Sequence, residues 1–252
     1  MLPQPRAHLR VHHFPFTTDA VRMSRLGIKR QLRRPVDRLE WTDAGWRWTE
    51  KGTGHVWDPE LRLPSSSYYR YRPGDYIAVA EACYVVPLAE EAFVPGEMYQ
   101  LRHPVTKQLI RLIYQADLKD GESQPSSAVA FGGNPPYWTV REVYRIVENR
   151  VERLQEITLE DVALEGFGSM RFYFTDYWDS IYGVTRDADK SAWQWEHNPY
   201  VHVLTYTNVH GEERYKAFSE MMRRWKEGRD KDEREAERLR RLDRLTPARG
   251  DK

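Results

Sequence analysis

Apolar residues are concentrated in four stretches whose composition predicts β-strands. The longest, residues 76–86, is rich in β-branched side chains and follows a turn with Pro73 at its second position, which predicts a central strand. Further strands are expected at residues 109–116 and 200–206. Over residues 140–153 apolar and polar positions alternate, which predicts a long strand with at least one exposed edge.

Capping residues and apolar spacings of three and four positions indicate the helices. Thr17 precedes a short apolar-periodic segment that Gly27 ends, which predicts a helix between them. Residues 158–165 open with a capping-box pattern and are followed by Gly166, so a second helix is expected there. The apolar spacing over residues 174–181 predicts a third helix. Residues 121–134 are rich in glycine, serine and proline and predict a loop.

The segment from residue 212 onward has a different character. An apolar stripe at i, i+3, i+4 and i+7 predicts a helix that docks on the rest of the protein, and it consists of Phe218, Met221, Met222 and Trp225. Beyond it the residues are mostly charged, with opposite charges four positions apart that typically contribute about 0.2–0.5 kcal/mol per pair. A weaker apolar stripe over residues 236–245 leaves two interpretations, a solvated tail or a surface for a protein partner.

The order of these elements predicts an α+β fold. A helix, three strands, two helices and a closing strand suit a small barrel with helices over its ends better than alternating βαβ units. We expect one domain over residues 1–210, with irregular insertions at about 41–70 and 87–135, the first containing a hairpin, followed by a charged helical tail at 211–252.

Charge and composition narrow the possible partners. The chain has 39 basic and 38 acidic residues, so any attraction to nucleic acid must be local. Residues 1–40 carry nine Lys/Arg against three acids. No apolar run reaches the roughly 20 residues that span a bilayer and no secretory signal is evident, so a cytoplasmic protein without membrane contact is expected. The single cysteine, Cys83, predicts a buried strand thiol, and the eight histidines show no metal-ligand spacing, so no metal or other cofactor is expected.

Several motifs occur together in an order found in one protein family. They are residues 27–34 (GIKRQLRR), 72–81 (RPGDYIAVAE), 136–141 (PYWTVR), 151–166 (VERLQEITLEDVALEG), 177–183 (YWDSIYG) and 198–201 (NPYV). Over roughly residues 15–207 the chain resembles the ASCH-domain proteins of bacteriophages and prophages. The resemblance implies a PUA-like small mixed β-barrel, a superfamily that recognises RNA and modified bases, and a phage protein in the host cytoplasm.

The resemblance also implies a candidate enzyme activity. Small bacterial ASCH proteins hydrolyse N4-acetylcytidine with a lysine, a threonine and a glutamate. The lysine falls on Lys29 and the glutamate on Glu165, but the threonine position is Leu32, which cannot act as a nucleophile. An amidohydrolase would therefore need water activated by Glu165, with Lys29 stabilising the oxyanion. The missing hydroxyl favours binding over catalysis.

The chemistry of the candidate residues predicts a cleft that holds a nucleobase. An exposed indole or guanidinium can stack on a base, carboxylates can accept from its amino group, and clustered cations can contact phosphate. A carboxylate in the last turn of a helix, as expected for Glu165, is disfavoured by about 0.3–1 kcal/mol unless a partner compensates. The set is Lys29, Arg33, Arg34, Glu81, Trp138, Arg141 and Glu165.

Structural alternatives remain for several of these residues. Glu81 and Arg141 can form a salt bridge, Trp138 can cap the core, and Glu165 can be a surface residue paired with a nearby arginine. Three functions follow: a nucleic-acid or nucleotide binding module with RNA as the first expected ligand, an amidohydrolase acting through Lys29 and Glu165, or a phage interaction factor acting through its C-terminal helix.

Overall fold

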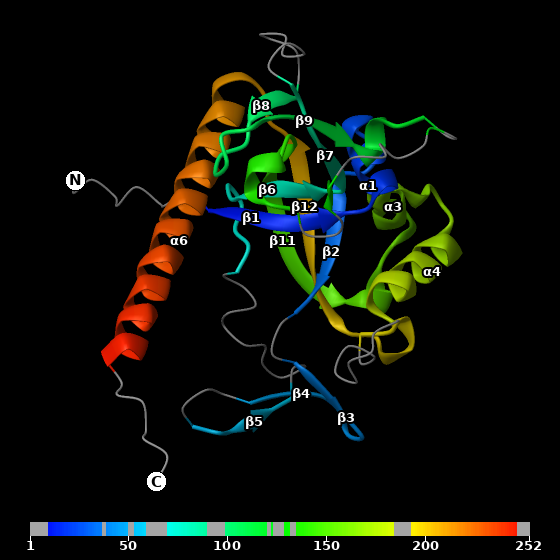
Figure 1. Ribbon diagram of the computed structural model, residues 1–252. Coiled ribbons are helices and arrows are strands. Elements are labelled where there is room, and N and C mark those ends of the chain that lie inside the picture. Colours follow the sequence, from blue (N-terminus) through cyan, green and yellow to red (C-terminus); the bar gives the residue numbers. More distant parts are fainter. Residues whose placement is uncertain are drawn as a thin grey trace, which may run out of the picture.

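The computed structural model shows a mixed α+β protein (Figure 1). It describes residues 10–36, 39–49, 53–58, 70–89, 99–119, 122, 129–131, 135–183 and 193–245. The expected α+β class is confirmed. Within these residues the strands form three sheets, and no strand pairing closes a sheet into a barrel, so the PUA-like barrel stays a prediction.

The largest sheet has five strands in the order β1 (Val11–Phe16), β6 (Tyr76–Glu81), β11 (Val143–Arg153), β12 (Tyr200–Asn208) and β2 (Gln31–Pro35). β1 and β6 are parallel, and the other neighbours are antiparallel. All six residues of β6 are buried, as expected for a central strand with apolar residues on both faces.

The long strand predicted at residues 140–153 is present as β11 and lies between β6 and β12. It pairs with β12 along most of its length but with β6 only through Val143–Arg145. Beyond this point one edge of β11 has no strand partner among the described residues, in agreement with the predicted exposed edge. The turn before β6 is confirmed, because the Asp75 amide donates to the Arg72 carbonyl at 2.9 Å. Gly74 in this turn has φ of 93°, a conformation that favours glycine.

The single strand predicted over residues 76–86 is wrong in one respect: it is two strands that belong to different sheets. The chain leaves the first sheet at Ala82 and continues as β7 (Cys83–Pro87). The second sheet has the order β10 (Val129–Phe131), β7, β9 (Leu109–Tyr114) and β8 (Gln100–Arg102). A uniform apolar run conceals this change, because all of β6 and the first three residues of β7 are buried.

Two further expectations concern irregular segments. The segment predicted as a loop over residues 121–134 contains β10, and most of its other residues lie outside those described. The hairpin expected within residues 41–70 is confirmed by a third sheet of β3 (Glu40–Thr42), β4 (Gly45–Thr49) and β5 (Val56–Trp57). Residues 59–69 of that segment also lie outside the described residues.

The first predicted helix is confirmed as α1 (Thr18–Arg25), with the Thr17 hydroxyl accepting from the Ala20 amide at 3.2 Å. The third is confirmed as α4 (Arg171–Tyr182). Short 3₁₀ turns connect the larger elements, and they are η2 (Gln115–Asp117), η3 (Tyr137–Thr139), η4 (Leu154–Glu156) and η6 (Trp195–His197).

The second predicted helix is shorter and less regular than expected. α3 (Leu159–Val162) has the predicted capping box, but it passes into a π-helical turn, η5 (Ala163–Phe167). Gly166 in this turn has φ of 97°, which L-residues rarely adopt, so the regular helix ends here. The turn carries Glu165 towards β2, where the Leu164 carbonyl accepts from the Arg30 amide at 2.7 Å.

The C-terminal helix α6 (Gly211–Leu245) runs along one side of the largest sheet, and α3 and α4 lie at the other side in Figure 1. The predicted apolar stripe docks: Met221 is buried, and Phe218 and Met222 pack beside it. The weaker stripe over residues 236–245 concerns side chains that lie outside the described part of the chain. No helix among the described residues is long and apolar enough to cross a membrane.

A buried histidine in β12 predicts acid sensitivity. Burial and the positive charge of Arg70 lower the pKa of His202 to about 4, and its Nδ1 donates to Asn149 Oδ1 at 3.3 Å. In the unfolded chain the pKa of this histidine is near 6.5, so the unfolded state binds the proton at a higher pH than the folded state does. The stability that the folded protein gains by keeping His202 neutral is therefore complete above about pH 6.5 and is lost as the pH falls towards 4.

Between pH 7 and pH 4 we therefore expect the free energy of unfolding to fall by roughly 3 kcal/mol less in His202→Gln than in the unmodified protein. Urea unfolding of both proteins at the two pH values measures this difference. Equal pH dependence in the two proteins would show that His202 is not held neutral in the folded state.

Candidate functional site

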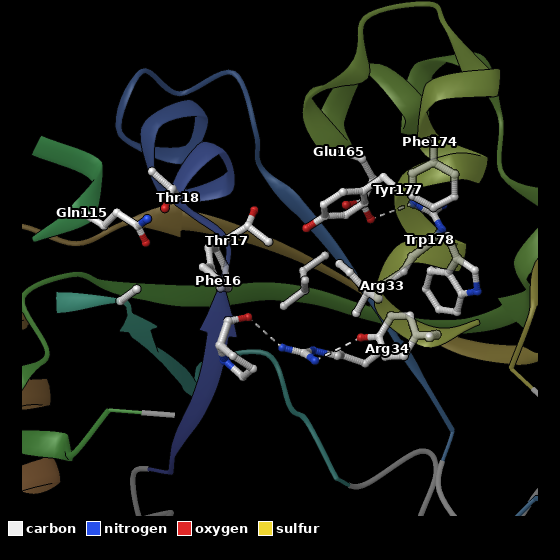
Figure 2. Close-up of a pocket in the computed structure, with 15 residues that line it drawn as sticks. Phe16, Thr17, Thr18, Arg33, Arg34, Gln115, Glu165, Phe174, Tyr177 and Trp178 are labelled. Carbon is white, nitrogen blue, oxygen red and sulfur yellow. Dashed lines mark hydrogen bonds and ion pairs between the residues drawn. The ribbon is translucent and has the colours of Figure 1, made fainter. Parts of the chain in front are cut away.

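A cavity of about 460 Å³ lies between the start of α1, β2 and α4 (Figure 2). One wall is aromatic and comes from α4, with Phe174, Tyr177, Trp178 and Tyr182. Apolar residues of β1 and β2 and the hydroxyl residues that precede and open α1 contribute to the rest of the lining. The polar lining residues are Thr17, Thr18, Arg33, Arg34, Gln115 and Glu165.

Glu165 is buried in this lining and has two cationic partners. Its carboxylate accepts from Lys29 Nζ through Oε2 and from Arg33 Nη1 through Oε1 at 3.1 Å. Lys29 Nζ also donates to the Glu165 main-chain carbonyl at 3.0 Å. All three side chains are only about 2% exposed. The ion pairs compensate the carboxylate, and pairing with an arginine was the structural alternative for Glu165, but that alternative placed the residue at the surface, whereas it is buried.

Lys29, Arg33 and Glu165 belong to a larger ionic network. Arg33 Nη2 donates to Glu152 Oε1 at 2.9 Å and lies 3.1 Å from Asp161 Oδ2. Arg150 joins both of these carboxylates. Burial alone would raise the pKa of Asp161, but hydrogen bonds from Arg150 and Gln31 and the charge of Arg33 lower it to about 2.

In the buried and half-buried part of this network three cations balance three carboxylates, and at its edge Arg150 also lies 4.0 Å from the exposed carboxylate of Glu148. The members are Lys29, Arg33, Arg150, Glu152, Asp161 and Glu165. Of the basic residues predicted to contact phosphate, Lys29 and Arg33 are therefore engaged internally. Arg34, the next residue along β2, lines the cavity and has no carboxylate within 4.0 Å among the described residues.

The cavity also contains hydroxyl groups that were not predicted as site residues. Burial raises the pKa of Tyr177 to about 12, so its hydroxyl is protonated at neutral pH, while the nearby Thr17 side chain acts in the opposite direction. Thr17 and Thr18 were interpreted only as the start of a helix. Because a helix cap explains Thr17 completely at the level of sequence, no pattern indicates a second position in a cavity lining.

Glu81 and Arg141 do not line this cavity. Arg141 donates to both Glu81 oxygens, at 2.8 and 2.6 Å, and also to Asp117. Arg25 adds a second cation through Asp117 and Glu142. This cluster joins the end of β6 to α1 and to η2, which is the salt-bridge alternative considered for these two residues.

Trp138 also lies away from the cavity. It packs with the buried cluster of the second sheet, where its ring is edge-on to Phe131 and His103 at centroid distances of 6.1 and 4.8 Å. The structure thus brings together Lys29, Arg33 and Glu165, with Arg34 in the same lining, and it places Trp138, Glu81 and Arg141 elsewhere.

The single cysteine lies outside the cavity lining. Cys83 is buried in β7, as predicted, and burial raises the pKa of its thiol to about 11. Among the residues that the structure describes, no three His, Cys, Asp or Glu side chains are grouped as a metal site requires.

Comparisons of the chain with protein-family models, with curated proteins and with solved structures find no match. Fold and site therefore define the protein only as an α+β protein. The cavity described above combines an aromatic wall with a buried, charge-compensated carboxylate.

Proposed function

We propose that the protein binds a nucleobase of a nucleotide or nucleic acid, with RNA as the first class to test, on a fold of the PUA-like ASCH type. The observation that carries this proposal is the buried Glu165 carboxylate in the lining of an aromatic cavity. A fold alone does not specify a ligand, so the argument for function depends on the chemistry of this cavity.

The shape and lining of the cavity suit a flat aromatic ligand. Its volume of about 460 Å³ is in the range of small-molecule sites, which are mostly apolar with few polar groups. Phe174, Tyr177 and Trp178 offer ring surfaces on one wall. Stacking between a base and an aromatic side chain contributes about 1–3 kcal/mol per base.

The electrostatics favour a neutral hydrogen-bond donor at Glu165. Each of its oxygens accepts one side-chain hydrogen bond, from Lys29 or Arg33, and each carboxylate oxygen has about two lone-pair sites. Because Lys29 and Arg33 already compensate the Glu165 carboxylate, no cationic ligand is needed to balance its charge. An exocyclic amino group, as in cytosine or adenine, donates without adding charge.

We expect cytidine or adenosine to bind at least about tenfold more tightly than uridine. A keto oxygen of uridine at the same place would face the Glu165 carboxylate, and because both groups are hydrogen-bond acceptors, neither would be satisfied. Isothermal titration with the three nucleosides measures this ratio. Leu32→Trp should weaken nucleoside binding at least about tenfold by filling the cavity that Leu32 lines.

The matched control is Leu26→Trp, because Leu26 is 74% exposed and does not line the cavity. It should leave binding unchanged. Circular dichroism and thermal unfolding establish that both variants are folded. Equal binding by a folded Leu32→Trp protein, or no binding of any nucleoside by the unmodified protein, would rule out this cavity as a base site.

An amidohydrolase is the second candidate, because Thr17 and Thr18 place hydroxyl groups in the same lining as Glu165. Against it, the residue at the family's threonine position, Leu32, lines the cavity, whereas Lys29 is not among the described lining residues. Incubation with N4-acetylcytidine distinguishes the two functions. Release of acetate by the unmodified protein, abolished in a folded Lys29→Ala variant, would favour hydrolysis.

A further inference from the structure

We propose that Arg34 forms an anion subsite in this cavity and that it takes a phosphate group of the ligand. This inference rests on the proposed base-binding function and extends it: the ligand is a phosphorylated nucleoside, as a mononucleotide or as part of a strand. Arg34 lines the cavity that contains Glu165 and lies on the opposite side of it in Figure 2.

Arg34 is held in position by contacts that do not neutralise its charge. Nη1 donates to the Tyr182 hydroxyl at 3.0 Å, and Nη2 donates to the Pro15 carbonyl at 3.2 Å. The guanidinium carbon lies 4.7 Å from the centre of the Phe14 ring. A guanidinium held by neutral groups is oriented before a ligand arrives, so less conformational freedom is lost on binding.

The donors of Arg34 are incompletely used. Its Nε is buried and has no hydrogen-bond partner among the described residues. A guanidinium has five N–H donors, and the hydrogen bonds of Arg34 to Tyr182 and Pro15 occupy two of them. A partly buried cation with unused donors is stabilised by an anion, and phosphate accepts from two donors of one arginine at once.

The charges of the other lining residues support an anion at Arg34 and not elsewhere. The charged lining residues are two cations, Arg33 and Arg34, and one carboxylate, Glu165. Arg33 and Glu165 pair with each other at 3.1 Å. The uncompensated charge in the lining is therefore that of Arg34, although the sequence presents Lys29, Arg33 and Arg34 as equivalent cations.

The test compares nucleosides with their phosphates by isothermal titration at low salt. Cytidine, cytidine 5′-monophosphate, cytidine 3′-monophosphate and a cytidine dinucleotide form one series, and the matching adenosine compounds form a second. In the unmodified protein we expect at least one phosphate position to improve the affinity about tenfold, and the improvement to decrease as salt is raised. The preferred compound distinguishes a phosphomonoester from the phosphodiester of a strand.

In Arg34→Gln the improvement should fall below about twofold, whereas the affinity for the nucleoside should change less than about twofold. Arg34→Lys, which keeps the charge but loses the two-pronged geometry, should retain part of the improvement and serves if the glutamine variant does not fold. Arg30→Gln is the matched control, because Arg30 is exposed, has no carboxylate within 4.0 Å among the described residues and does not line this cavity.

The outcomes separate the two proposals. Nucleoside binding that no phosphate improves, or an improvement that persists in folded Arg34→Gln and Arg34→Lys, overturns the anion subsite and leaves the base-binding function intact. Absence of binding by every compound overturns both. An improvement lost in Arg34→Gln and kept in Arg30→Gln supports the subsite at Arg34.

Discussion

Arg33→Met is expected to lower the free energy of unfolding by about 3–5 kcal/mol, because it removes one partner of a buried ionic network and leaves carboxylates uncompensated. Arg33 is about 2% exposed and contacts Glu152, Asp161 and Glu165 at 2.9–3.1 Å. Removing the cation leaves Glu165 with Lys29 alone and gives the buried network an excess negative charge. Urea unfolding at pH 7 measures the loss.

Arg145→Met provides the control for this change. Arg145 lies in the same sheet but is 44% exposed, and its partner Glu213 lies at 3.3 Å. Surface ion pairs of this kind contribute about 0–1 kcal/mol, so the control should remain close to the unmodified protein. A loss in Arg33→Met as small as that of the control would contradict the buried network described for Glu165.

Arg141→Met is expected to be similarly destabilising, by about 3–5 kcal/mol, for the same physical reason at a different place. Arg141 is 6% exposed and its guanidinium carbon lies 3.6 Å from the centre of the Tyr114 ring. Without the Arg141 guanidinium, the ion-pair partner that remains to Glu81 among the described residues is Arg25, at 4.0 Å. Unfolding measured beside the Arg145→Met control tests this expectation.

Arg141→Met also tests the boundary of the site. Because Arg141 does not line the cavity, the folded variant should bind nucleosides with an affinity within about twofold of the unmodified protein. A loss of tenfold or more, at a temperature where the variant is folded, would show that Arg141 contacts the ligand. The site would then extend to the cluster of Glu81 and Asp117.

Local features of the fold could be predicted because their causes are local. The Thr17 and Thr158 caps, the turn before β6 and the docking stripe around Met221 each depend on a few neighbouring residues. Side-chain hydrogen bonds to nearby amides and the 3.6-residue period act within one or two turns. The change of sheet at Ala82 could not be predicted, because two buried strands in succession have the same apolar pattern as one.

For the candidate site, too, the sequence predicted some features and not others. The residue types that the site needs were evident from the sequence, and so was the alternative in which Glu81 pairs with Arg141. Their grouping was not evident, because it depends on contacts between distant segments: Lys29 and Glu165 are 136 positions apart, and Arg33 and Glu152 are 119 apart. Trp138 illustrates the error, since an aromatic residue between prolines and a strand has the same local pattern whether it packs in a core or faces a ligand.

By itself, then, the sequence determined the starts of α1 and α3, the longer apolar strands, the α+β class and the supply of cations, carboxylates and aromatic rings. The tertiary structure decided which charges are neutralised. Arg33 and Arg34 are adjacent and chemically identical, yet successive side chains of a strand point in opposite directions. Both residues line the cavity, but Arg33 enters a network of three carboxylates, whereas Arg34 lies beside neutral groups. Electrostatic pairing depends on distance in space, which the order of residues along the chain does not specify.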